Sequence, residues 1–236
     1  MTVRVAMWSG PRNISTAMMR AWENRPDTVV VDEPLYAAYL QRTGIDHPGR
    51  EEVIASQPTD PQDVVRRLRE DDSAPVHYAK HMTHHLLADL PVDWVRDFRN
   101  VLLVRDPAEV VSSYVRSRES CEPEDIGLLQ QLRLLEALPE TPPVIDASDF
   151  LRDPESHLRW VCDWLGISFT AAMLHWPAGP RESDGVWAPH WYDAVVRSTG
   201  FEPWRARTVE LSEHDAAVAE ACRPAYDELR ALRLRL

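Results

Sequence analysis

An arginine and two hydroxyl side chains lie close together where an apolar run ends and a segment of helix formers begins. The arginine is Arg12, and Ser15 and Thr16 open the helical segment. Backbone N–H groups of such a loop and first helical turn point toward one place, where the helix dipole adds partial positive charge. A guanidinium adds a full charge and a planar fork that suits phosphate or sulfate. The whole loop is therefore a candidate anion-binding segment: Gly10, Pro11, Arg12, Asn13, Ile14, Ser15 and Thr16.

The nearest common motif is the nucleotide-binding loop G-x-x-x-x-G-K-[ST], in which the lysine holds the β- and γ-phosphates. Gly10 is present here, but the second glycine and the lysine are missing. This difference disfavours an ordinary ATPase or kinase. A P-loop kinase of small metabolites or nucleotides stays as an alternative. So does a plain turn in which Pro11 and Ser15 only end a strand and start a helix.

Charged residues also follow the second and third predicted strands. Glu33 comes directly after the second strand, and Lys80 ends the third, with His81 and His84 close behind. Ligands of open α/β sheets bind outside the carboxyl ends of the strands. Glu33 is therefore a candidate general base, Lys80 a candidate cation, and one histidine a candidate for proton transfer. The simpler interpretation makes Glu33 a carboxylate that complements a helix dipole, and places the histidines at the surface or at helix ends.

The histidines also raise the question of a metal site. His81 and His85 are four residues apart, which is a metal-binding spacing on a helix. No glutamate lies between them as in the zinc-protease pattern, and no third ligand is evident. We therefore expect no metal.

A second arginine follows the fourth predicted strand. Arg105 ends this strand, and Asp106 and Pro107 give a clear helix start. Ser113 lies further along the same helix, so Arg105 and Ser113 are placed to hold a second phosphate group. Much later, residues 176–192 are rich in Trp, Pro and Gly. They predict either a loop that folds over a ligand or an ordered surface loop pinned by its tryptophans.

The elements that must position these residues alternate between strands and helices. Apolar runs, several of them rich in β-branched residues, predict strands at residues 3–8, 27–32, 74–79, 100–104 and 143–146. Capping residues and amphipathic spacing predict helices at residues 15–22, 34–41, 63–70, 108–118, 122–138, 154–165 and 213–234. Residues 43–60, rich in Pro, Gly and Asp, predict a surface excursion of the kind that covers a substrate pocket. The length favours a single α/β domain, residues 1–236.

Composition restricts the class of partner. The chain has 26 Lys and Arg against 38 Asp and Glu, a formal net charge of −12, so nucleic acid and anionic membrane surfaces are poor partners. Its three cysteines lack metal-ligand spacing and suggest a reducing compartment. Neither a signal peptide nor an apolar run of membrane-spanning length is evident, so we expect a cytoplasmic protein.

Three segments, in order, resemble the sulfotransferases that use 3′-phosphoadenosine 5′-phosphosulfate (PAPS), in particular a bacterial branch of that P-loop superfamily. Residues 9–16 are similar to the 5′-phosphosulfate loop, with Arg12 where the family has Lys or Arg. Arg105, with Ser113 eight residues on, is similar to the 3′-phosphate segment. Residues 181–187 look like the family's late loop, which closes on the nucleotide. This last likeness adds three candidate cofactor-binding residues: Arg181, Gly185 and Trp187.

The resemblance implies a three-layer α/β sandwich with a central, mainly parallel sheet. It also implies PAPS as co-substrate without a metal, and in-line transfer of the sulfuryl group to a hydroxyl of a small-molecule acceptor. Glu33 would take the acceptor proton, with His81 or His84 as the second choice. Arg12 and Lys80 would stabilise the charge that builds up on the sulfuryl oxygens and the leaving phosphate.

The chain also departs from the family. Cytosolic sulfotransferases place their base in a Lys-Thr-His run, whereas this chain reads Lys80-His81-Met82, so the histidine is out of register. A glutamate after the second strand, as in another bacterial branch, favours Glu33. A non-catalytic adenine-nucleotide-binding protein is a further alternative, and a homodimer is compatible with the sequence.

Overall fold

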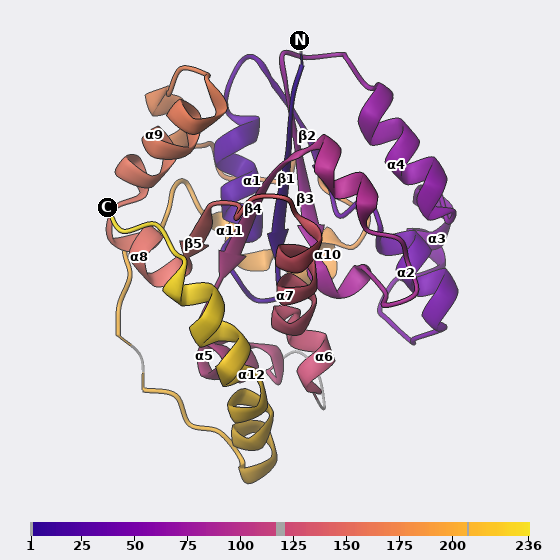
Figure 1. Ribbon diagram of the computed structural model, residues 1–236, viewed down its shortest axis with the longest axis vertical. Coiled ribbons are helices and arrows are strands. Elements are labelled where there is room, and N and C mark those ends of the chain that lie inside the picture. Colours follow the sequence, from indigo (N-terminus) through magenta and orange to yellow (C-terminus); the bar gives the residue numbers. More distant parts are fainter. Residues whose placement is uncertain (1, 117–120, 207) are drawn as a thin grey trace.

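The computed structural model describes residues 2–116, 121–206 and 208–236 (Figure 1). Within them, five parallel strands form one sheet in the order β2-β3-β1-β4-β5. The strands are β1 (Val3–Ser9), β2 (Thr28–Asp32), β3 (Val76–Met82), β4 (Arg99–Val104) and β5 (Val144–Asp146). Because all of them run in one direction, the segments that follow the strands meet at one edge of the sheet, the carboxyl edge.

Helices cover both faces of the sheet, as Figure 1 shows. On one face lie α1 (Ser15–Glu23), α8 (Ala147–Arg152) and α9 (Pro154–Leu165). On the other lie α4 (Pro61–Glu70), α5 (Pro107–Tyr114), α7 (Leu128–Ala137) and α12 (Glu213–Ala231). The predicted α/β fold, a parallel sheet between two helical layers, is confirmed. Among the described residues, no helix is both long and apolar enough to cross a membrane.

Shorter elements surround the carboxyl edge and the margins of the sheet. Near the end of β2 lie α2 (Tyr36–Thr43) and α3 (Arg50–Ser56), which share a small apolar cluster with residues 187–192. The remaining elements are α6 (Pro123–Ile126), α10 (Ala188–Trp191), α11 (Asp193–Arg197) and the 3₁₀ turns η1 (Thr83–His85), η2 (Asp93–Asp97) and η3 (Ala171–Leu174).

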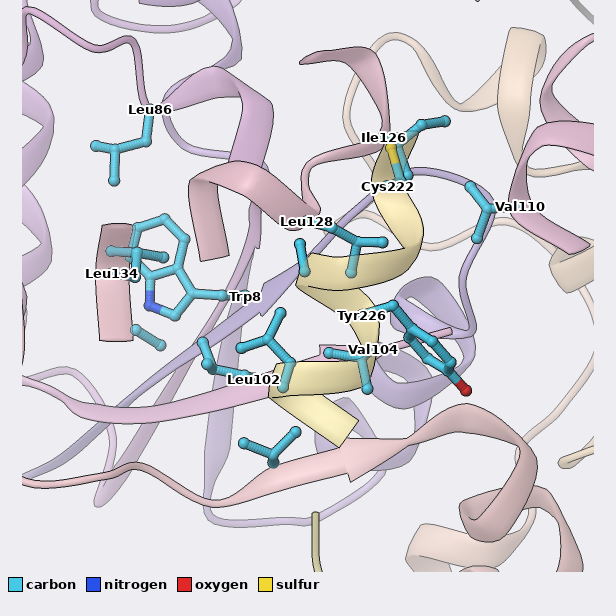
Figure 2. Packing of buried hydrophobic residues seen from close by; sticks show 14 of the residues in the cluster. Trp8, Leu86, Leu102, Val104, Val110, Ile126, Leu128, Leu134, Cys222 and Tyr226 are labelled. Carbon is cyan, nitrogen blue, oxygen red and sulfur yellow. The ribbon is translucent and has the colours of Figure 1, made fainter. Parts of the chain in front are cut away.

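Side chains that alternate in direction along the central strands fill two cores, one on each face of the sheet. In a strand, successive side chains point to opposite faces. Trp8 and Leu102 therefore belong to the core on the face covered by α7 and α12, whereas Met7 and Leu103 belong to the core on the face covered by α1. Figure 2 shows Trp8 and Leu102 in the same cluster as Tyr226 of α12. Each large side chain buried in this way contributes about 1.5–3 kcal/mol, so the central strands form a stable frame for the carboxyl edge.

Strand β3 lies further along the chain than predicted, and this sets the direction of its polar side chains. The expected strand began at residue 74 and ended at Lys80, but the observed one runs from Val76 through Met82, and all seven of its residues are buried. Parallel pairing extends it, since the last three residues of β1 lie opposite Lys80, His81 and Met82. Lys80 and His81 are thus consecutive strand residues that point to opposite faces.

Three other expectations needed correction. The excursion at residues 43–60 contains helix α3, whose Val53 is fully buried. The helix expected at residues 122–138 is interrupted at Gly127, whose φ of 81° breaks the helical ladder into α6 and α7. Helix α5 ends at Tyr114, and the last predicted residues of this helix, Ser117 and Arg118, lie outside the described residues.

Candidate active site

A cavity of about 660 Å³ lies at the carboxyl edge and collects most of the predicted site residues. The segments after β1, β2, β3 and β4 contribute to its lining, together with residues 190–205. The predicted residues that line it are Pro11, Arg12, Asn13, Ile14, Ser15, Thr16, Glu33, Lys80, His84, Arg105 and Ser113. The two anion-binding segments and the candidate base, which are far apart in sequence, therefore share one space.

Hydrogen bonds join the two anion-binding segments to each other. Arg12 donates from Nε to Ser113 Oγ at 3.0 Å, and Arg105 donates from Nη1 to the backbone oxygen of Arg12 at 2.9 Å. Asn13 fixes the loop to the end of β4, since its Nδ2 donates to the Leu103 oxygen at 3.1 Å. Arg12 has a φ of 53°, an unfavourable backbone conformation for a residue with a side chain. The loop is thus held in one shape by contacts with the β4 segment.

The electrostatics of this region favour an anion. Burial lowers the pKa of Arg12, and the positive charges of Arg105 and Arg116 lower it further. Within the described part of the chain, no carboxylate forms an ion pair with Arg12. Arg105 is already paired with Glu109 at 2.8 Å, so a bound phosphate or sulfate would offset chiefly the charge of Arg12.

Gly10 has a packing role and does not line the cavity. A Cβ added at this position would lie 2.0 Å from the backbone oxygen of Ile126. Gly127 faces it from the α6–α7 junction, where an added Cβ would lie 3.1 Å from the Gly10 Cα. The glycine therefore allows the loop to pass close to α6 and α7, and this close approach is a reason for a glycine here that is independent of any ligand.

A buried charge network holds the candidate base. Lys80 donates to Glu33 Oε1 at 2.7 Å, to Asp32 Oδ1 at 2.9 Å and to the Tyr192 hydroxyl at 2.5 Å. Tyr192 in turn donates to Asp32 Oδ2 at 2.7 Å. Like Arg12, Glu33 is a non-glycine residue with positive φ, at 41°. Since the backbone at Glu33 is strained, the network and the Glu33 N–H bond to the Lys80 oxygen at 2.9 Å must maintain this conformation.

The network also sets the charge states. Burial raises the pKa of Glu33 above its ordinary value, and the Asp32 charge adds to this effect while Lys80 opposes it. Burial lowers the pKa of Lys80, but Asp32 and Glu33 together outweigh it and raise this pKa overall. A carboxylate with a raised pKa is a better proton acceptor, which suits a general base.

The contacts of Lys80 bear on the charge-stabilising role expected for it. An ammonium group has three N–H donors, and three oxygens of Asp32, Glu33 and Tyr192 already surround this one. Lys80 lines the cavity, but its side chain points into the network. Its observed contacts position Glu33, which leaves charge stabilisation to the arginines that line the cavity, Arg12 among them.

The three histidines after Lys80 have different positions. His81 stacks on Trp8 with ring centroids 4.1 Å apart, contacts Trp94, and does not line the cavity. The structure thus separates this second-choice base from the site, because β3 carries His81 to the opposite face of the sheet. His84 lines the cavity as predicted, and so does His85, which sequence reasoning considered only as a metal ligand.

The burial of His81 predicts acid sensitivity. Burial lowers its pKa from 6.5 to about 3, so between these pH values the unfolded chain binds a proton at His81 that the folded chain does not. The stability associated with neutral His81 is present above pH 6.5 and is lost as the pH falls, by about 1.4 kcal/mol per unit. In urea unfolding from neutral pH to about pH 4, His81→Leu is expected to lose stability less steeply than the parent chain. Equal slopes in the two chains would contradict this explanation.

The three predicted cofactor-binding residues of the late loop, Arg181, Gly185 and Trp187, do not line the cavity. Gly185 N–H donates to Asp32 Oδ2 at 3.1 Å, and Trp187 Nε1 donates to the Tyr192 hydroxyl at 3.1 Å. These two residues therefore hold Asp32 and Tyr192 of the buried network in place without lining the cavity. Arg181 binds the Pro177 oxygen and lies 3.8 Å from a Glu23 carboxylate oxygen.

The cavity is lined instead by the last residues of the loop, 190–192, and by the segment that follows, residues 193–205. This segment brings two arginines that sequence reasoning missed, Arg197 and Arg205, together with Gly200 and Trp204. Their signal in the sequence is an arginine, a glycine, a tryptophan and an arginine within nine residues. Among the described residues, no group of three or more His, Cys, Asp or Glu is arranged to hold a metal ion.

Comparisons with known proteins agree with this architecture. The family model described as "Sulfotransferase domain" matches residues 3–233, so the chain belongs to the sulfotransferase domain family. Branched-chain-amino-acid aminotransferase-like protein 1 of Arabidopsis thaliana is 40% identical over 232 residues. The match covers 94% of this chain and 41% of that protein, so the chain spans about two fifths of its length.

Solved structures of low sequence identity share the fold. The sulfotransferase domain from the curacin biosynthetic pathway has a TM-score of 0.61 at 17% identity, covering 94% of this chain and 98% of that one. The sulfotransferase domain from the Synechococcus PCC 7002 olefin synthase has a TM-score of 0.58 at 18% identity, covering 94% and 95%. The chain thus belongs to the sulfotransferase domain family by sequence and shares its α/β fold with these structures.

Proposed function

We propose that the chain transfers the sulfuryl group of PAPS to a hydroxyl of a small-molecule acceptor. One observation carries this proposal: the Arg12 loop, the Arg105–Ser113 segment and Glu33 share one cavity. The two arginines lie at the same edge of the sheet, where one donor could reach them with its 3′- and 5′-phosphate groups. Membership of the sulfotransferase family supports the chemistry.

The residues present fit the donor. Backbone N–H groups of the loop at residues 10–16, with the Arg12 guanidinium, would hold the 5′-phosphosulfate. Arg105 and Ser113 would hold the 3′-phosphate, because they combine a fork of donors with a hydroxyl. PAPS supplies the electrophilic sulfuryl group. Arg12 stabilises the negative charge that grows on the leaving 5′-phosphate, and this preorganised charge lowers the barrier.

Glu33 activates the acceptor. Its carboxylate takes the proton of the acceptor hydroxyl while the acceptor oxygen forms a bond to sulfur. The bond from sulfur to the bridging phosphate oxygen breaks, and that oxygen keeps the electron pair. Lys80 holds Glu33 Oε1 during this step, so the base keeps its orientation.

The cavity suits a small acceptor. Beyond Glu33 its lining is largely aromatic and imidazole side chains, including Tyr36, His47, His84, His85 and Trp191. Such rings favour a compact alcohol with an apolar or planar body.

A transfer assay tests the proposal. The chain is incubated with PAPS and a panel of aliphatic alcohols, aryl alcohols and phenols, and products are measured by mass spectrometry. We expect a product that carries one added sulfuryl group, and release of adenosine 3′,5′-bisphosphate in equal amount. Phosphorylation of the same alcohols with ATP and magnesium, without sulfation, would instead support a kinase.

A further inference from the structure

We propose that His85 and Glu33 form a two-point clamp that holds the acceptor hydroxyl between them. The inference rests on the function proposed above and adds a second catalytic residue to it. In the clamp, Nε2–H of His85 donates to the acceptor oxygen, and Oε2 of Glu33 accepts the hydroxyl proton.

The spacing of the two groups fits one oxygen atom. His85 Nε2 lies 4.0 Å from Glu33 Oε2, which is too far for a direct hydrogen bond. If an oxygen lies about 2.8 Å from both atoms, the angle at that oxygen between Nε2 and Oε2 is about 90°, which a hydroxyl accommodates. Both residues line the same cavity as Arg12, so an acceptor at this point has access to the donor site.

Both atoms are available for a ligand. The other carboxylate oxygen of Glu33, Oε1, accepts from Lys80 at 2.7 Å and lies 3.3 Å from the Tyr192 hydroxyl oxygen. Within the described part of the chain, neither Glu33 Oε2 nor His85 Nε2 forms a hydrogen bond of its own. The buried His85 Nδ1 also has no hydrogen-bond partner there. Lys80 thus binds one carboxylate oxygen of Glu33, Oε1, and the other oxygen, Oε2, which faces His85, is left for a ligand.

Stacking holds the imidazole in place. The His85 ring lies parallel to Tyr36, with centroids 4.6 Å apart and an interplanar angle of 10°, and stacks on Tyr39 at 4.8 Å and 28°. Its side chain is only 2% exposed. Two aromatic faces therefore fix the direction of Nε2 without using either ring nitrogen, which preorganises the clamp.

The charge state agrees with a donor role. Burial lowers the pKa of His85 well below its ordinary value, and the nearby His84 and His47 add to this effect. A neutral imidazole has one N–H, and the facing carboxylate favours placing it on Nε2. During transfer the acceptor proton goes to Glu33 and His85 keeps its own proton, so the imidazole orients the oxygen and stays neutral.

A matched pair of amides tests the clamp. In His85→Gln the amide nitrogen reaches about as far as Nε2, whereas in His85→Asn it reaches only as far as Nδ1. Kinetics are measured with PAPS and the best acceptor of the alcohol panel. We expect His85→Asn to lose about 10–100-fold in kcat/KM for the acceptor. The kcat/KM of His85→Gln is expected to be at least tenfold higher than that of His85→Asn. The KM for PAPS is expected to stay within about twofold in both. His77→Leu, a buried histidine of β3 outside the cavity, is the control and keeps the parent kinetics.

The outcomes separate the clamp from the function. The rise in Tm caused by adenosine 3′,5′-bisphosphate reports an intact donor site in each variant. If that rise is lost in His85→Asn, His85→Leu takes its place. Parent-like kinetics in His85→Asn, or in His85→Leu where it replaces that variant, would overturn the clamp alone. So would losses equal to those of His85→Gln while the nucleotide site is intact. Absence of any transfer by the parent chain would overturn the proposed function and the clamp with it.

Discussion

Replacement of Glu33 by glutamine is expected to lower kcat for sulfuryl transfer by about 10²–10⁴. The amide has the shape of the carboxylate but cannot accept the acceptor proton. Lys80 keeps Asp32 and Tyr192 as partners, so the fold is expected to survive. Steady-state turnover with PAPS and the panel acceptor measures the loss, and the Tm rise with adenosine 3′,5′-bisphosphate shows that the donor site is intact. Near-normal turnover in this variant would show that Glu33 is not the base.

The same assignment predicts a pH dependence. A general base works only when it is deprotonated, so the rate must fall as the pH decreases through the pKa of Glu33. Burial and the Asp32 charge raise this pKa, and the acidic limb of kcat/KM should therefore lie above the ordinary glutamate range. The limb should disappear from the residual activity of Glu33→Gln. An unchanged limb in that variant would assign the titration to another group.

Replacement of Arg12 by alanine is expected to have an effect of similar size, about 10²–10⁴ in kcat, because a cation that stabilises the leaving phosphate is removed. The side chain also carries the Nε–H bond to Ser113, so binding of adenosine 3′,5′-bisphosphate should weaken as well. Arg12→Lys is expected to recover part of kcat, since a point charge remains but the planar fork does not. Turnover and nucleotide affinity, measured together, check both effects.

Arg66→Ala is the matched control for Arg12. Arg66 is an exposed arginine of α4 that pairs with Asp63 and does not line the cavity. Its loss should leave turnover and nucleotide affinity unchanged, because exposed ion pairs have small effects. If Arg12→Ala behaved like Arg66→Ala, the loop would not hold the sulfuryl donor.

Local chemistry allowed much of the fold to be predicted. The β1 run and the β4 run are short, apolar and followed by clear helix starts, and both strands lie where the sequence places them. The meeting of Arg12 with Arg105 also follows from sequence, because parallel strands bring their carboxyl ends to one edge. Such inferences need only the periodicity of each segment and the direction of its strand.

The remaining features depend on contacts over long separations. Pairing with β1 extends β3 and turns His81 away from the cavity, which the polar run after residue 79 does not indicate. Tyr192 reaches Asp32 across 160 positions in the chain, and nothing near Tyr192 in the sequence indicates that partner. The aromatic late loop was predicted either to fold over a ligand or to be an ordered surface loop. Its Gly185 and Trp187 support the buried network, and the end of the loop with the segment after it lines the cavity.

Calorimetric titration of the chain with adenosine 3′,5′-bisphosphate and with AMP tests the central claim most directly. If the proposed site is right, Arg105 and Ser113 bind the 3′-phosphate, which adenosine 3′,5′-bisphosphate carries and AMP lacks. Charge-assisted hydrogen bonds to that group contribute about 1.5–3 kcal/mol, so we expect the bisphosphate to bind about 10–100-fold more tightly than AMP. Equal affinity for the two nucleotides would contradict a PAPS site in this cavity.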